Sequence, residues 1–156
     1  MVFTIGDYFM EILFYSEKKI HYIIKLIEKN MKENSNEPFF QKHYDDFEYI
    51  KCALYDISIE NSYLHGVDFY SITHEYNMVA NYSMEVNIFS VTYEQGLYKI
   101  AHLVKFICDR LKTDIVVLSD TAKVVYKYNF QTNTVDYIDK KFWKHQSYHY
   151  LYPKWL

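Results

Sequence analysis

Two segments of the chain have the hydrophobic spacing of an amphipathic helix. In residues 17–31 and again in residues 92–111, apolar side chains recur every three or four positions and polar side chains fill the gaps, which is the period of an α-helix. Ser16 is a preferred N-cap residue for the first helix, and Thr92 with Gln95 forms a capping box for the second. The second apolar stripe consists of Leu97, Ile100, Ala101, Val104, Cys108 and Leu111.

The other apolar segments are predicted strands. Residues 53–60 and 83–91 alternate apolar and polar side chains, as a half-buried strand does. With residues 67–75 they are expected to form an antiparallel meander of three strands. The remaining predicted strands are residues 8–15, 114–119, 122–128 and 135–138. The order β-α-β-β-β-α-β-β-β predicts an α+β fold with two helices on one face of an antiparallel sheet.

The length of 156 residues is typical of one domain that buries a core without disulfides. Cys52 and Cys108 lie far apart in apolar surroundings, so we expect buried, reduced thiols. Residues 32–38 read as a loop within this domain. Residues 142–156 hold six aromatic residues and are expected to wrap the core as an irregular tail.

The apolar runs are too short for membrane insertion. A membrane-spanning helix needs about 20 apolar residues, whereas the longest uninterrupted runs here resemble residues 115–118. Residues 1–14 contain Asp7 and Glu11 and lack a basic segment followed by an apolar one, which a secretory signal requires. We therefore expect a cytoplasmic protein that does not associate with membranes.

The charges of the chain are sorted along the sequence. Residues 34–96 contain ten acidic and two basic residues, whereas residues 97–156 contain five acidic and ten basic residues. Carboxylates on adjacent strands can mimic the phosphate track that a basic nuclease recognises; the alternative is an ordinary solvated face. The candidate binding residues are Asp45, Asp46, Glu48, Asp56, Glu60, Asp68 and Glu75.

No sequence motif for catalysis or metal binding is present. The seven histidines form no H-E-x-x-H pattern, and the isolated glycines form no phosphate-binding loop. His43 lies beside Asp45 and Asp46 and could imitate an acid/base cluster; solvated loop residues are the alternative. His145 and His149 share the spacing of one helical turn, but their neighbours favour ordinary packing or exposure. We predict a protein with no metal, no cofactor and no enzymatic activity.

Residues 82–143 contain a strand, a long helix, Asp114 before an apolar strand, a hairpin and a closing Phe142-Trp143 pair. This order resembles bacterial immunity proteins of the swarming-inhibition (Sit) type and the immunity partners of contact-dependent growth inhibition toxins (CdiI-like). The resemblance implies one immunity domain over residues 1–156. It also implies a non-enzymatic, cytoplasmic protein that neutralises the C-terminal domain of one cognate toxin.

The acidic middle of the chain agrees with such a partner, because many such toxins are nucleases with basic clefts. Direct nucleic-acid binding is not expected from a net charge of −3. Two other classes stay open. One is a small nucleic-acid-processing enzyme or accessory that uses the basic C-terminal third as a stacking platform; the other is a structural subunit of a larger assembly.

Overall fold

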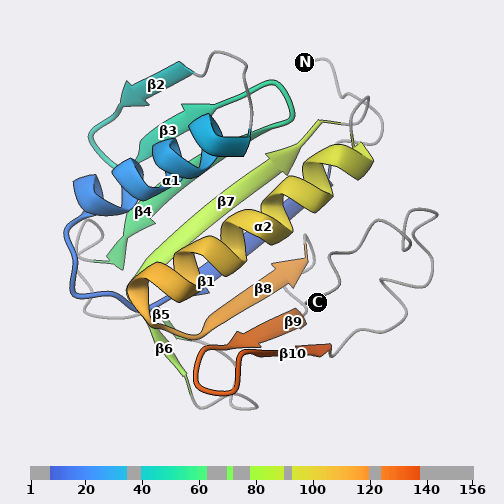
Figure 1. Cartoon of the computed structure of the whole chain (residues 1–156). Coiled ribbons are helices and arrows are strands. Elements are labelled where there is room, and N and C mark those ends of the chain that lie inside the picture. Colours follow the sequence, from blue (N-terminus) through green and yellow to red (C-terminus); the bar gives the residue numbers. More distant parts are fainter. Residues whose placement is uncertain are drawn as a thin grey trace.

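Two helices lie side by side across one face of an antiparallel sheet (Figure 1), so the predicted α+β fold is confirmed. The computed structural model describes residues 8–34, 40–62, 70–71, 78–89, 93–119 and 124–137. The helices are α1 (Ile20–Asn34) and α2 (Tyr93–Leu111). The strands are β1 (Tyr8–Phe14), β2 (Phe40–His43), β3 (Glu48–Lys51), β4 (Tyr55–Asn61), β5 (Tyr70–Ser71), β6 (Val79–Ala80), β7 (Tyr82–Ile88), β8 (Ile115–Ser119), β9 (Val124–Asn129) and β10 (Thr134–Tyr137).

The main sheet has eight strands in the order β10-β9-β8-β1-β7-β4-β3-β2, and each neighbouring pair is antiparallel. Strand β1 lies near the centre between β7 and β8, and α2 connects these two neighbours. The predicted meander is wrong, because β4 pairs directly with β7. Strand β5, which falls inside the predicted strand 67–75, pairs with β6 in a separate two-stranded sheet.

The core lies between the helices and the sheet. The register places Ile12, Met84, Ile57 and Val117 of four adjacent strands on the helix side, where all four are fully buried. The predicted stripe of α2 faces them and is confirmed as buried, except that Leu111 is half-buried. Both cysteines are buried and free, as predicted.

Gly96 allows α2 to begin close to the sheet. A Cβ atom at this position would lie 2.5 Å from the Ile88 Cγ2 atom and 3.1 Å from the Leu54 carbonyl oxygen. A contact of 2.5 Å essentially never occurs for a real Cβ atom, and one of 3.1 Å is unusually tight. The missing side chain of Gly96 therefore fixes the approach of α2 to β7.

The predicted start of the first helix is wrong. Ser16 does not cap α1, which begins at Ile20; instead its Oγ accepts a hydrogen bond from the Lys18 N–H at 3.1 Å. The Ser16 N–H also donates to Asn81 Oδ1 at 2.9 Å, and Tyr82 Oη donates to the Lys18 carbonyl at 2.5 Å. These bonds to the β7 side of the molecule hold residues 16–18 in a turn and delay the helix.

The sequence pattern also did not predict the hairpin of β2 and β3, which is closed by a turn in which the Tyr44 N–H donates to the Phe47 carbonyl at 3.0 Å. Helix α1 continues to Asn34, into the segment predicted as a loop. Thr92, the tail 142–156 and both histidines at 145 and 149 lie outside the described residues. Neither described helix is long and apolar enough to cross a membrane.

Candidate functional site

The sheet has a second face that the helices do not cover, which we call the open face. Part of it is apolar: Leu13, Val116 and Leu118 are buried there against Ala80 of β6, with Met78 packed beside them. Strand β6 of the small sheet therefore packs against the open face. Apart from Phe9 of β1, mostly polar side chains occupy the rest of the open face, along β1, β7, β4 and β3.

Four carboxylates gather at the centre of the open face. Glu11 of β1 is directly opposite Glu85 of β7. Both lie on the open face, because they alternate along their strands with residues that face the helices. On β4, Glu60 is opposite Ser83 and Asp56 is opposite Asn87, which places both acids on the same side as Glu85. We call this group the acidic face; it consists of Glu11, Asp56, Glu60 and Glu85.

The surroundings of Glu85 disfavour its charged form. Partial burial raises the pKa of its carboxyl group, and the nearby charges of Glu60 and Glu11 raise the pKa further. Like charges placed directly opposite each other on neighbouring strands destabilise a sheet. The acidic face therefore carries a repulsion that a positively charged partner would relieve.

Two of the carboxylates are held in place by hydroxyl groups. Ser83 Oγ donates to Glu11 Oε1 at 2.9 Å, and Tyr49 Oη of β3 donates to Asp56 Oδ2 at 3.1 Å. Partial burial and the Asp56 carboxylate raise the pKa of Tyr49 to about 12, so the phenol stays a donor even in alkaline solution near its ordinary pKa of about 10. These bonds hold the acids in fixed positions and thus reduce the entropy lost on binding.

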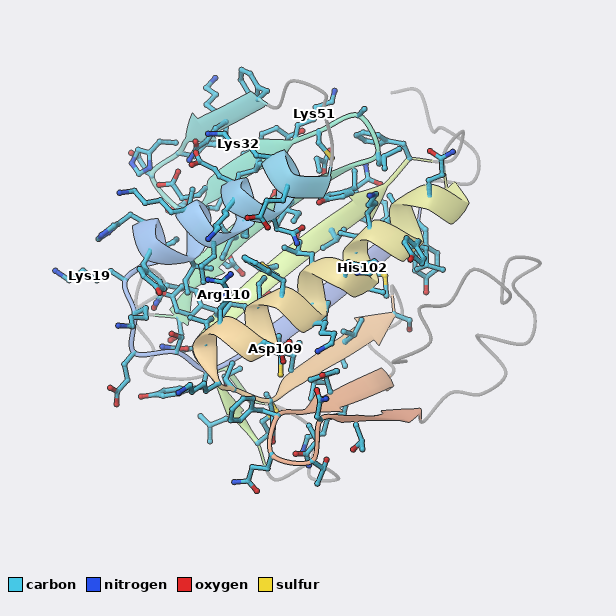
Figure 2. The ribbon with its side chains drawn as sticks, viewed as in Figure 1. Lys19, Lys32, Lys51, His102, Asp109 and Arg110 are labelled. Atoms are coloured by element: carbon cyan, nitrogen blue, oxygen red, sulfur yellow. The ribbon has the colours of Figure 1, made fainter. Side chains whose placement is uncertain are left out.

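Aromatic and basic side chains border the acidic face. The register row that contains Asp56 has Phe9 of β1 at one end and Lys51 followed by Phe40 at the other. Phe9 is 55% exposed and Phe40 is 54% exposed. Lys51, the last residue of β3, is labelled in Figure 2, and its Nζ lies 5.5 Å from the centre of the Phe89 ring.

The structure brings together only part of the predicted acidic set. Asp56 and Glu60 lie on the acidic face, and Asp45 and Asp46 are exposed in the turn between β2 and β3. That turn lies at the Glu60 end of the sheet, because β3 and β4 are paired there. Asp68 and Glu75 lie outside the described residues.

Glu48 faces the other way. It is opposite Ile59, which is buried on the helix side of the sheet. Its carboxylate contacts His43 Nδ1 across the β2–β3 hairpin. The histidine considered as part of an acid/base cluster with Asp45 and Asp46 therefore has Glu48 as its partner, and both aspartates remain solvated turn residues.

Sequence reasoning missed Glu11 and Glu85. Both interrupt predicted strands as single polar residues between apolar neighbours, and that position is the available signal, because a strand turns such a residue away from the core. Within the described residues, no group of three or more histidine, cysteine or acidic side chains could hold a metal ion.

No protein-family model, curated protein or solved structure matches this chain. The fold and the site together define an α+β protein whose sheet is covered by helices on one face and carries clustered carboxylates on the other. This geometry is the basis for the functional proposal below.

Replacing Glu85 by glutamine should stabilise the isolated protein at neutral pH. The pKa of Glu85 is raised by folding, so its charged form opposes the folded state above that pKa. The effect fades as pH falls through the raised pKa and is gone below the ordinary glutamate pKa of about 4.3. We expect a gain of up to about 1 kcal/mol at pH 7, the range for cross-strand pairs, and none at pH 3. Urea unfolding at both pH values measures this gain.

Glu33→Gln on the exposed surface of α1 is the matched control and should change the unfolding free energy at neither pH. A loss of stability in Glu85→Gln at pH 7 would show that Glu85 makes a favourable contact instead.

Proposed function

We propose that this protein is an immunity protein that binds a cognate bacterial toxin domain through the acidic face and thereby neutralises it. The observation that supports the proposal most directly is the placement of Glu11 directly opposite Glu85, with Glu60 beside them. Folding alone gains nothing from this repulsion. Local arrangements that oppose stability tend to occur at functional sites, and a basic partner would convert the repulsion into attraction.

The chemistry of the acidic face suits a nuclease toxin. A nuclease must present a cleft rich in lysine and arginine to bind phosphates, and clustered carboxylates can occupy that cleft in place of the nucleic acid. Complementary charge increases the rate of encounter. The face would act by exclusion of the substrate, so the immunity protein needs no catalytic group and no cofactor, and it would work in the cytoplasm of the toxin-producing cell.

Exposed aromatic side chains beside the carboxylates would slow dissociation of the bound toxin domain. Phe9 and Phe40 are both more than half exposed, and Tyr49 lies between their strands on the same face. Aromatic side chains are enriched among residues whose truncation weakens interfaces most. We therefore assign the carboxylates to steering and orientation, and the aromatic rings to slow dissociation.

Co-expression tests the proposal. The toxin candidate is the C-terminal domain of the large protein encoded directly upstream in the source genome, produced from an inducible promoter in a sensitive host. Cells should survive only when this protein is present, and the two proteins should co-purify. Absence of any such upstream gene, or cell death despite abundant folded protein, would contradict the immunity function.

A further inference from the structure

A second site lies where the beginning of α1 meets the end of α2. A pocket with a volume of about 570 Å³ opens there, and its lining includes Tyr15, Lys18 and Tyr22 from one side and Arg110 and Lys112 from the other. Figure 2 shows Arg110 near the end of α2, in the region between that helix and α1. No residue of the acidic face lines this pocket.

The pocket is basic. Three cations line it against one acid, Glu17. Within the described part of the chain, none of these cations forms an ion pair with a carboxylate. Asp109, the neighbour of Arg110, is instead paired with Lys105 at 2.7 Å. The positive charge of the pocket is thus available to a ligand.

Arg110 is the only arginine in the chain. Its guanidinium carbon lies 4.9 Å from the centre of the Phe106 ring, and Lys18 Nζ lies 5.2 Å from the centre of the Tyr22 ring. A guanidinium group presents paired N–H donors that match two oxygens of a phosphate or a carboxylate at once, which an ammonium group cannot do. Because three cations line the pocket, a doubly charged phosphate group compensates their charge better than a single carboxylate does.

Helix α1 contributes to the same field. It has 15 residues and no acidic residue in its first turn, so the positive end of its dipole is not compensated there. The pocket lining includes residues 15–18, which lead directly into this helix, and Tyr22 of its first turn. The C-terminal end of α2 lies at the same pocket and its dipole is negative there, so the attraction for an anion rests on the three cations.

Lys112 occupies a position that normally favours glycine. It follows the last residue of α2 with a positive φ of 53°, and the Thr113 N–H donates to the Cys108 carbonyl at 3.3 Å, which is the hydrogen bond of a Schellman C-cap. Glycine adopts this conformation without a steric penalty, whereas a lysine does not. A basic side chain thus stands beside the pocket at a position where the backbone alone would favour glycine.

We propose that this pocket binds a mononucleotide, with Arg110, Lys18 and Lys112 around the phosphate and Tyr15 or Tyr22 against the base. Phosphate alone would fill a small part of the volume of about 570 Å³, which falls within the range of small-molecule sites. The two exposed phenol rings supply flat surfaces suited to stacking. The site is separate from the acidic face, so its occupancy does not depend on the immunity function.

Titration of the full-length protein with AMP, adenosine and inorganic phosphate tests the proposal. Backbone amide chemical shifts are followed by NMR at low and high salt. AMP should bind more tightly than either fragment, shift the amides of residues 15–18 and 110–113, and bind more weakly at high salt. Equal affinity for AMP and phosphate, equal affinity for AMP and adenosine, or no shift at these residues at millimolar AMP would overturn the assignment.

Two variants distinguish binding in the pocket from attraction of AMP to the overall charge of the protein. Arg110→Gln should weaken AMP binding by about tenfold or more, as expected for the loss of a charged hydrogen bond. Lys25→Gln, on the exposed surface of α1 outside the pocket, should leave the affinity unchanged. Unchanged affinity in a folded Arg110→Gln variant would exclude Arg110 from the site and overturn the proposal.

Lys112→Gly gives a readout that a purely structural role cannot reproduce. Because glycine accepts the positive φ, this variant should keep or raise the Tm, yet it should bind AMP several-fold more weakly. Loss of stability and of binding together would indicate that Lys112 acts through the fold instead.

Discussion

Replacing Val104 by aspartate should unfold this protein at room temperature. Val104 is fully buried in α2 and belongs to the main core cluster. An aspartate there would lose about 1.5–3 kcal/mol of apolar burial and would also place a carboxylate in the core without a partner, which costs several kcal/mol more. Domains of this size are stable by about 5–15 kcal/mol. Circular dichroism during thermal unfolding should show little or no cooperative transition.

Tyr98→Asp is the matched control for this substitution. It introduces the same residue into the same helix, at a position where the tyrosine side chain is 37% exposed. The Tyr98 ring packs edge to face with the His102 ring, and the two ring centres are 4.5 Å apart. We expect a loss of at most about 1 kcal/mol. Val104→Thr, which nearly keeps the shape of valine, should give an intermediate loss of about 1–3 kcal/mol that remains measurable. A Val104→Asp protein with the parent's Tm would show that this helix face is not the packed one.

The helices and the longer strands could be predicted because an element that is buried on one side has apolar residues at regular spacing in its sequence. In α2 the buried side chains recur at helical spacing, and in β4 the burial alternates from Tyr55 through Ile57 to Ile59. Helix α2 and strand β4 contact the core along one stripe only, so their own residues carry the signal. The start of α1 could not be predicted in this way, because the bonds from Asn81 and Tyr82 to residues 16–18 are formed between distant segments.

Strand β2 shows where this signal is lost. All four of its residues, Phe40–His43, are exposed, so neither face is marked by apolar side chains, and only pairing with β3 makes the segment a strand. The neighbours of β7 could not be predicted for another reason. Strand β7 pairs with β4 on one side and with β1 on the other, over seven residues each. Nothing in the sequence of residues 67–75 shows that this segment does not lie between β4 and β7.

The candidate site was half predictable. Alternation in β4 placed Asp56 and Glu60 on the side away from the core, as the structure has them. Glu11 and Glu85 joined them only through the pairing of β1 with β7, which connects residues far apart in sequence, as the hydrogen bond from Ser83 to Glu11 across 72 positions illustrates. Counting charge along the chain cannot reveal such a contact. The raised pKa of Glu85 is likewise a property of the assembled sheet.

Reversing the charge of Glu60 and Glu85 to lysine should abolish protection against the upstream-encoded toxin domain. Both side chains lie on the acidic face, and Glu85 is opposite Glu11, so a lysine at position 85 would form a favourable cross-strand pair and the fold should survive. A basic cleft would then meet two added positive charges. We expect the association rate constant at low salt to fall by about tenfold or more, within the range of electrostatic steering.

Salt dependence and a matched double variant make this prediction specific. Screening shortens the Debye length from ~10 Å at 0.1 M to ~3 Å at 1 M, so association of the parent should slow with salt while the reversed variant stays slow throughout. Glu28→Lys with Glu33→Lys changes the net charge equally but on α1, across the sheet from the acidic face, and should have a much smaller effect. If both double variants slow association equally, net charge alone is responsible. If neither does, the acidic face is not the contact surface, and the aromatic residues 142–156 become the next candidate.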